Sequence, residues 1–249
     1  MATNKKLKFG LLGKSIDYSF SPGYFAKKFE RENLPHCDYR NFDCATVEEV
    51  FSTIQRTDLK GLNVTIPYKE EVIPAMDELS PTGKAIGAVN TIIFTEDGKR
   101  IGDNTDAYGF ERALFDQYDG NPKRALILGT GGASKAVHYV LRKRGITPQY
   151  VSRKAGENSI DYAALTKAVI EEHELIINCT PLGTFPEVDY APALNYEALT
   201  AKHFLFDLVY NPAETLFLKL GKKQGAGIAN GADMLVHQAN RSWELWMEE

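Results

Sequence analysis

Strand-like and helix-like segments alternate along almost the whole chain, and this alternation restricts the possible folds more than any other feature. Short apolar or alternating runs predict strands, and apolar residues three to four positions apart predict helices. The expected strands are 7–12, 38–42, 61–64, 88–94, 100–103, 125–128, 150–152, 175–179, 204–209 and 227–229. The expected helices are 22–31, 47–55, 69–76, 108–117, 131–144, 162–172, 213–220 and 232–246. This order predicts an α/β fold with parallel sheets covered by helices on both faces.

The alternation restarts near residue 106, which predicts two domains that are each built from β and α segments. A segment "TEDGK" with an Asp-Gly turn joins two strands just before the restart and indicates a β-hairpin. A breaker, "GNPK", then precedes the next strand. A chain of 249 residues is long enough for two domains with their own cores.

Charge and composition exclude several classes of partner. The net charge is −4 with both signs mixed, so nothing indicates a nucleic-acid or membrane surface. The start, "MATNKKLKFG", lacks the apolar run of a signal peptide, and no apolar run reaches membrane length. Cys37, Cys44 and Cys179 lack metal-ligand spacing. We therefore expect a cytoplasmic protein with buried thiols and no metal.

The stretch "RALILGTGGASKAV" predicts a dinucleotide site. An apolar strand runs into a glycine turn that opens a helix, which is the context that the dinucleotide fingerprint requires. Gly129 permits a tight turn, Gly131 lets the backbone approach a pyrophosphate, and the helix start offers unpaired N–H groups. The third glycine of the strict pattern is replaced by Ser134. A purely structural turn remains the alternative.

The end of the next strand predicts which dinucleotide binds. An NAD site carries an acidic residue there, about 20 residues past the glycines, to bind the ribose 2′-hydroxyl. This chain has Ser152, Arg153 and Lys154 instead. A carboxylate would repel a 2′-phosphate, whereas an arginine can clamp it, so we expect NADP. A solvated basic turn is the alternative.

An early stretch, "FGLLGKSIDYSFSP", contains Gly-Lys-Ser and so raises the possibility of a P-loop. That motif needs a glycine five positions earlier, where this chain has Lys8 within a strand. The residues after Ser15 do not open a helix either, so the P-loop interpretation fails. Two serines, Ser19 and Ser21, are left without an assigned ligand.

Polar side chains also cluster in "GLNVTIPYKE", "GAVNT" and "GDNTDAYG" at strand ends, where ligands bind to such sheets. We expect Lys69 to begin a helix, where a cation opposes the helix dipole and has little value for stability. Asp106 also begins a helix, so a capping role is its alternative. A lysine–aspartate pair suits redox chemistry on a secondary alcohol, because negative charge develops on oxygen as hydride is transferred.

These motifs together resemble the shikimate dehydrogenase family, and the resemblance covers nearly the whole chain. It implies that Ser19 and Ser21 bind a substrate carboxylate and that Lys69 and Asp106 are catalytic. The implied substrate residues are Ser19, Ser21, Thr65, Lys69, Asn90, Asp106, Tyr210 and Gln238. The implied cofactor residues are Gly129, Thr130, Gly131, Gly132, Ala133, Ser152, Arg153, Lys154, Thr180, Leu208 and Gly231.

The resemblance also implies a domain arrangement. Residues 1–105, completed by the closing helix at 231–249, would form a substrate domain with a mainly parallel sheet. Residues 106–230 would form a Rossmann-type NADP domain, with the active site in the cleft. The chain departs from the family at Tyr18, commonly histidine, Ser15, commonly proline, and Ala107, commonly glycine. These departures affect the fine shape of the carboxylate pocket.

The sequence therefore predicts an NADP-dependent shikimate dehydrogenase that reduces 3-dehydroshikimate to shikimate in the chorismate pathway of aromatic amino acid biosynthesis. Two alternatives stay open: a quinate/shikimate dehydrogenase of broader specificity, and a non-catalytic NADPH-binding sensor on the same fold. Its expected partners are the small-molecule substrate and cofactor, with a monomer or homodimer as the assembly.

Overall fold

The computed structural model describes residues 6–17 and 19–248, so the departure at Tyr18 lies outside the described residues. The chain divides into two compact units, one of Met1–Thr105 with Gln238–Glu249 and one of Asp106–His237. We expected 231–249 to complete the first unit, but 231–237 belong to the second. None of the described helices has the length and apolar character needed to cross a membrane.

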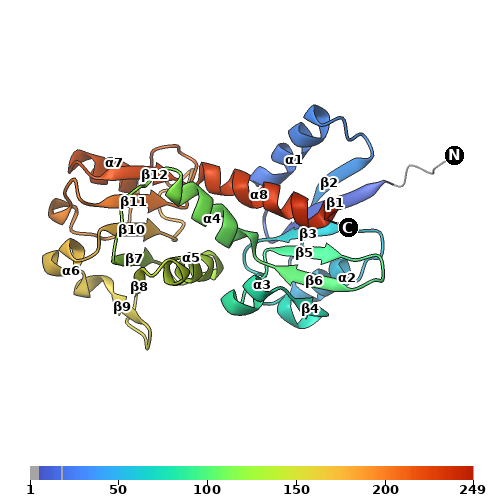
Figure 1. Cartoon of the computed structure of the whole chain (residues 1–249), viewed down its shortest axis with the longest axis horizontal. Coiled ribbons are helices and arrows are strands. Elements are labelled where there is room, and N and C mark those ends of the chain that lie inside the picture. The colour runs from blue at the N-terminus through green and yellow to red at the C-terminus, as the bar shows by residue number, and fades with distance from the viewer. Residues whose placement is uncertain (1–5, 18, 249) are drawn as a thin grey trace. The chain divides into compact units, whose positions relative to one another are not determined.

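The first unit contains a six-stranded sheet in the order β2-β1-β3-β5-β6-β4 (Figure 1). Its strands are β1 (Leu7–Gly13), β2 (Cys37–Asp43), β3 (Gly61–Val64), β4 (Glu78–Leu79), β5 (Thr91–Phe94) and β6 (Arg100–Asp103). Strand β5 pairs antiparallel with β3 and β6, while every other pairing is parallel. The expectation of a mainly parallel sheet with one hairpin is thereby confirmed.

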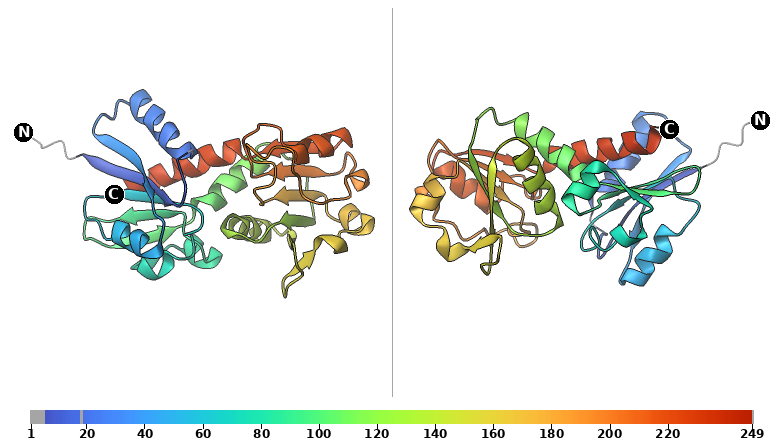
Figure 2. Two further views of the ribbon diagram at one scale, coloured as in Figure 1. Left: turned by 180° about the vertical axis from the view of Figure 1, so that it is seen from behind. Right: turned by 60° about the horizontal axis from the view of Figure 1, so that its bottom comes forward.

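Helices cover both faces of this sheet (Figure 2). They are α1 (Phe20–Arg31), α2 (Val47–Ile54), α3 (Pro81–Ile86) and the later part of α8 (Ala232–Met247). Apolar residues of α1 and α8 form one buried cluster with β1, and those of α2 form another with β1, β3 and β5.

The expected helix at 69–76 is wrong. Residues 67–72 form turns, and only a single 3-10 turn, η1 (Ile73–Ala75), follows them. Pro74 lies inside the expected helix, where it lacks the N–H for an intrahelical bond and its ring clashes with the preceding turn. The helix instead forms further on as α3, which Ser80 caps by accepting from the Gly83 N–H and which ends at Gly87 with φ +68°.

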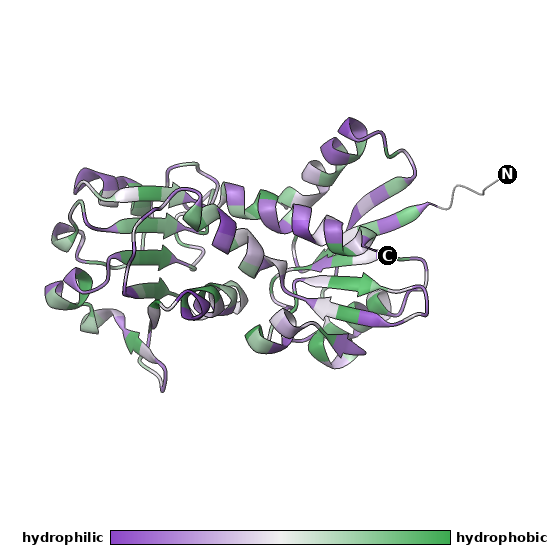
Figure 3. Cartoon of the chain, in the orientation of Figure 1, coloured by the Kyte–Doolittle hydropathy of each residue, from purple (hydrophilic) through white to green (hydrophobic). Residues whose placement is uncertain are grey.

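The second unit contains a six-stranded, wholly parallel sheet in the order β12-β11-β10-β7-β8-β9. Its strands are β7 (Arg124–Leu128), β8 (Thr147–Ser152), β9 (Ser159–Asp161), β10 (Leu175–Asn178), β11 (Phe204–Asp207) and β12 (Gly227–Asn230). Strands β10 and β11 are buried throughout, and the hydropathy colouring shows the apolar character of these central strands (Figure 3). Burial on both faces is typical of parallel sheets.

The helices of this unit are α4 (Thr105–Phe115), α5 (Gly132–Lys143), α6 (Lys167–Glu171), α7 (Leu216–Lys223), the start of α8 and the 3-10 turns η2 (Tyr162–Ala164) and η3 (Tyr196–Ala198). Helices α5, α6 and α7 lie between strands, while α4 precedes β7 and α8 follows β12. The expected helix at 162–172 is wrong as one element, because Thr166 caps a new helix by accepting from the Val169 N–H. Strand β9 was not expected. The two βα units confirm the predicted α/β fold.

Trp246 anchors α8 on the first sheet. Its ring is fully buried and stacks on Phe9 with centroids 5.0 Å apart, and its indole N–H donates to the Ile92 carbonyl at 3.0 Å. A Cβ added to Gly61, at the start of β3, would collide with this ring. The glycine therefore leaves the space that the indole occupies.

We expect Gly61→Ala to lower the free energy of unfolding by about 1–3 kcal/mol, because the added methyl group overpacks the Trp246 site. Urea unfolding monitored by tryptophan fluorescence measures this change. Gly23→Ala is the matched control: a Cβ there meets nothing within 4 Å, and alanine inside α1 should stabilise by about 0.5–1 kcal/mol. An unchanged midpoint for Gly61→Ala would contradict the packing argument.

Candidate active site

Most of the predicted substrate residues lie at one edge of the first sheet. Strands β1, β3 and β6 end at this edge and β5 begins there, since Leu12 is opposite Val64 and Thr91 is opposite both Asn63 and Asp103. The predicted residues follow these ends: Ser19 and Ser21 after β1, Thr65 and Lys69 after β3, Asn90 before β5, and Asp106 after β6. Parallel pairing of β1 with β3, and antiparallel pairing of β5 with β3 and β6, thus bring together residues that are far apart in the chain.

Hydrogen bonds tie the connecting loops of this edge together. The Lys14 N–H donates to the Ile66 carbonyl at 3.1 Å, and the Val89 N–H donates to the Lys69 carbonyl at 2.7 Å. Lys69 is half-buried in a turn and does not begin a helix, so the expected conflict with a helix dipole does not exist. Its backbone position is set instead by pairing with the residue that precedes Asn90.

A buried polar network lies beneath this edge. Asn63 donates from Nδ2 to Ser242 Oγ at 2.8 Å, and Ser242 and Thr91 hydroxyls are 2.8 Å apart. Asn90 Oδ1 accepts from the Thr105 N–H at 2.7 Å and from the Thr91 hydroxyl at 3.0 Å. All five residues are at least 97% buried. Because buried polar groups cost free energy unless paired, this network fixes both Asn90 and the start of α4.

Asp106 and Gln238 extend from this network. Asp106 directly follows Thr105 in the first turn of α4, and Gln238 lies on α8, where its carbonyl accepts from Ser242 Oγ at 3.0 Å. Both residues are buried, each with about 6% of its surface exposed. The sequence motifs include these two residues but not Thr91, Thr105 and Ser242, which form the buried network beside them.

Asp43 forms hydrogen bonds to the loop that connects β1 to α1, which we call the serine loop. Its carboxylate accepts from the N–H groups of Ser15 and Ile16 at 2.9 and 3.3 Å. Ser15 has φ +55°, which a proline ring cannot adopt, and proline has no N–H to donate. Proline, which is common in the family at this position, could not adopt this φ or donate to Asp43 as Ser15 does.

The two serines lie at the start of α1. Ser19 occupies the N-cap position without a capping bond from its side chain, and Ser21 is buried in the first turn. Burial raises the pKa of the neighbouring Tyr39 hydroxyl, and a hydrogen bond with Ser21 opposes that rise. The same hydroxyl donates to Asn63 at 2.9 Å, which connects the serines to the buried network.

The predicted cofactor residues lie in the second unit at the carboxyl ends of its parallel strands. They are Gly129, Thr130, Gly131, Gly132 and Ala133 after β7, Ser152, Arg153 and Lys154 at β8, Thr180 after β10, Leu208 after β11, and Gly231 after β12. Tyr210, which we expected at the substrate, also belongs to this unit and is 37% exposed.

The two glycines of the turn differ in backbone conformation and surroundings. Gly129 adopts φ +104°, where side chains are strained, and a Cβ there would lie 3.1 Å from Thr180 Cγ2. A Cβ on Gly131 would meet no protein atom within 4 Å, so the face it would cover is open to a ligand. Ser134, in place of the third glycine, is buried and donates from Oγ to the Gly131 carbonyl at 2.7 Å.

The basic turn after β8 presents two exposed cations. The Ser152 hydroxyl donates to the Lys154 carbonyl, which closes the turn. Arg153 and Lys154 are exposed, and within the described part of the chain neither forms an ion pair. Leu208 and Gly231 lie against each other at the far end of the edge, because a Cβ on Gly231 would collide with the Leu208 carbonyl.

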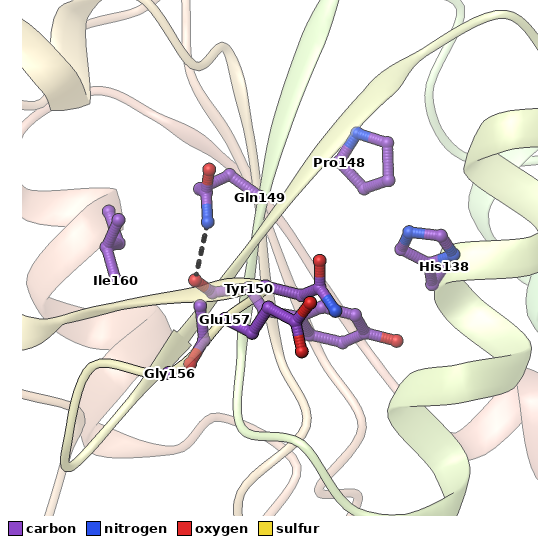
Figure 4. A pocket seen from close by; sticks show the side chains of 9 residues that line it. His138, Pro148, Gln149, Tyr150, Gly156, Glu157 and Ile160 are labelled. Carbon is purple, nitrogen blue, oxygen red and sulfur yellow. Dashed lines mark hydrogen bonds between the residues drawn. The ribbon is translucent and has the colours of Figure 1, made fainter.

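A pocket of about 690 Å³ lies beside these motifs, between α5, β8 and the turn before β9 (Figure 4). His138 and Tyr150 stack in it with centroids 5.1 Å apart. Burial lowers the pKa of His138 and raises that of Tyr150 to about 12. The Tyr150 hydroxyl donates to the Ser134 carbonyl at 3.3 Å, which links the pocket to the glycine turn. No predicted site residue lines it.

Comparison with known proteins identifies relatives along the whole chain. Residues 11–92 match the family model described as the shikimate dehydrogenase substrate binding domain. The NADP⁺ shikimate dehydrogenase of Methanosphaera stadtmanae is 34% identical, covering 99% of this chain and 93% of that protein. The one from Clostridium beijerinckii is 37% identical, covering 96% and 92%.

Solved structures give the same result. A shikimate dehydrogenase in complex with NADP⁺ superposes with a TM-score of 0.89 at 31% identity, covering 100% of this chain and 92% of the other. The Thermus thermophilus shikimate 5-dehydrogenase in complex with NADP(H) and shikimate has a TM-score of 0.86 at 31% identity, covering 98% and 94%.

The two turn glycines should respond differently to alanine. Gly131→Ala should keep the free energy of unfolding within about 1 kcal/mol of the wild type, because only a helix N-cap position changes. It should nevertheless weaken dinucleotide binding, because the methyl group covers the open face. Gly129→Ala should also lower stability, since its φ is strained for alanine. Calorimetric titration and urea unfolding separate the two effects, and wild-type affinity in Gly131→Ala would refute the assignment.

Proposed function

The chain belongs to the shikimate dehydrogenase family, and we propose that it catalyses the reversible, NADP-dependent reduction of 3-dehydroshikimate to shikimate. The observation that carries this proposal is the grouping of Ser19, Ser21, Thr65, Lys69 and Asn90 at one sheet edge, with Asp106 following from it. A glycine turn and an exposed arginine at the edge of the second sheet supply what a phosphorylated dinucleotide requires.

The substrate binds to the first unit in this proposal. Ser19 and Ser21 hold the carboxylate with hydroxyl donors and with the N-terminus of α1, where an anion is favoured. Thr65, Asn90, Asp106 and Gln238 orient the ring hydroxyls, and Tyr210 is the remaining substrate residue in this proposal. The buried network under Asn90 and Thr105 keeps these groups in place before the substrate arrives.

The chemistry divides between Lys69 and Asp106. NADPH, when bound, supplies the hydride that reduces the carbonyl carbon. Negative charge then develops on the carbonyl oxygen, and the Lys69 ammonium donates a proton to that oxygen. Asp106 accepts from the substrate hydroxyl or the lysine and so orients the pair. In the reverse direction Lys69 accepts the proton from the shikimate hydroxyl.

The cofactor binds to the second unit in this proposal. The 129–133 turn and the start of α5 receive the pyrophosphate, and Ser152, Arg153 and Lys154 receive the 2′-phosphate. Thr180, Leu208 and Gly231 lie along the nicotinamide side. We further propose a cytoplasmic enzyme, in keeping with three cysteines that form no disulfide, and a monomer or homodimer as its assembly.

Removal of the lysine tests the chemistry. Lys69→Ala should lower kcat by at least about 10², with a smaller effect on the KM for shikimate, because the ammonium acts mainly on charge that develops in the transition state. Steady-state kinetics with shikimate and NADP⁺ measure both constants. Lys84→Ala, which removes an exposed lysine of α3, is the control. A Lys69→Ala enzyme with half the wild-type kcat would contradict this role.

Removal of the arginine tests the cofactor choice. Arg153→Ala should raise the KM for NADPH at least about tenfold, because a charge-assisted bond to the 2′-phosphate is lost. Activity with NADH, which lacks that phosphate, should stay nearly the same. Arg142→Ala, at the end of α5, serves as the control for loss of a surface cation. Equal losses with both cofactors would exclude this assignment.

A quinate/shikimate dehydrogenase of broader specificity is the second candidate. The observation that favours it is a quinate dehydrogenase from Corynebacterium glutamicum, solved with NAD, which superposes with a TM-score of 0.87 at 26% identity and covers 98% of this chain. Assays of quinate and shikimate with each cofactor distinguish the two. Absence of turnover with either substrate would point instead to the NADPH-binding sensor.

A further inference from the structure

Asp207 is a fully buried carboxylate at the end of β11. Its Oδ2 accepts from the Thr215 hydroxyl at 2.5 Å, and its Oδ1 accepts from the Val209 N–H at 3.0 Å and from Asn178 Nδ2 at 2.9 Å. Burying a carboxylate is costly unless donors surround it, and here three donors do so. They come from three segments: the cap of α7, the loop after β11 and the end of β10.

Asn178 forms hydrogen bonds both to Asp207 and to the turn after β10, and so connects the two. While its amide nitrogen donates to Asp207, its Oδ1 accepts from the Thr180 N–H at 3.0 Å and the Thr180 hydroxyl at 2.6 Å. The Leu182 N–H then donates to the Thr180 hydroxyl at 3.3 Å. The carbonyl of Asn178 accepts from the Leu208 N–H at 2.9 Å. Two loops that carry predicted cofactor residues are thus joined to one carboxylate.

We propose that Asp207 is a positioning residue for the dinucleotide: through Asn178 it sets the turn at Thr180 and the backbone at Leu208 in the geometry that receives the cofactor. The inference rests on the proposed function, because it takes Thr180 and Leu208 as cofactor contacts. It extends that function by assigning a role to a carboxylate that does not itself touch cofactor or substrate. The charge orients the amide of Asn178, since an ionised carboxylate can only accept, so Oδ1 must face Thr180.

The charge of Asp207 changes in an accessible pH range. Burial raises the pKa of Asp207 to about 6, and the bonds from Thr215, Val209 and Asn178 oppose that rise. Two other titratable groups act on the same cluster, Cys179 after β10 and Tyr196 in η3. Burial raises the pKa of both, so they stay neutral between pH 5 and pH 8. Of these three groups, Asp207 is therefore the one whose charge changes as pH rises through about 6.

The test is calorimetric binding of NADP⁺ to the wild type and to Asp207→Asn. The asparagine keeps the shape but removes the charge that orients Asn178, so the Kd should rise about tenfold or more at pH 8. The ratio of the two Kd values should fall toward one as pH is lowered from 8 to 5, because the wild-type carboxyl becomes neutral. The 2′-phosphate of NADP⁺ also titrates near pH 6, but its effect cancels in the ratio.

A matched control is Asp161→Asn. Asp161 lies in the same unit, and its carboxylate caps η2 by accepting from the Ala164 N–H. This substitution should leave the Kd for NADP⁺ unchanged. In kinetics, Asp207→Asn should raise the KM for NADP⁺ but not the KM for shikimate. A role limited to stability would lower the unfolding midpoint and leave the Kd of the folded protein unchanged.

If Asp207→Asn does not fold, Thr215→Val and Thr215→Ser replace it. Only Thr215→Ser keeps a hydroxyl that can donate a hydrogen bond to Asp207, so only Thr215→Val should weaken NADP⁺ binding. A Kd ratio near one at pH 8 for Asp207→Asn, or a ratio that does not change with pH, would overturn the inference. Failure of the wild type to bind NADP⁺ would overturn the proposed function itself, and the two failures are therefore distinguishable.

Discussion

Hydrogen bonding between strands, in a fixed register, is the constraint on which the remaining structure depends. Parallel pairing aligns the carboxyl ends of the strands throughout the second sheet and of β1 and β3 in the first. Antiparallel pairing brings the start of β5 to the ends of β3 and β6. Leu12 is opposite Val64 in the first sheet, and Leu128 is opposite Asn178 in the second. A one-residue change of register would turn every side chain to the opposite face, so the buried faces fix the alignment. The alignment of the strands therefore also sets the positions of the loops that follow the strand ends.

Buried polar groups fix the loops at the edge of each sheet where the predicted site residues lie. In the first unit, hydroxyl and amide groups of Asn63, Thr91 and Ser242 surround the segment that leads to Asp106. In the second, the Asp207 carboxylate plays this part for the turns after β10 and β11. Such groups are costly to bury unless every partner is present, so they tolerate few alternative arrangements. A ligand site above them can therefore be formed before the ligand binds.

Sequence reasoning predicted most of the elements, because periodicity and turn chemistry are local. Strands β3 and β6 begin and end where the pattern placed them, and the helix after the glycine turn differs by one residue at each end. The failures have local causes too. Pro74 lies inside the expected helix 69–76, and the cap at Thr166 divides the expected helix 162–172. Pro74 and Thr166 are both visible in the sequence, but the two helices were predicted from the spacing of apolar residues alone.

The sequence by itself determined the α/β class, the glycine turn, the basic turn of Arg153 and the motifs that mark the family, because each depends on residues adjacent in the chain. Only the tertiary structure decided that Ser242 lies beside Thr91, that Asp43 accepts from the Ser15 N–H, and that Asp207 is buried among three donors. Those contacts join residues separated by up to 151 positions. No local pattern encodes them, since they depend on how the strands pair and on which side chains that pairing buries.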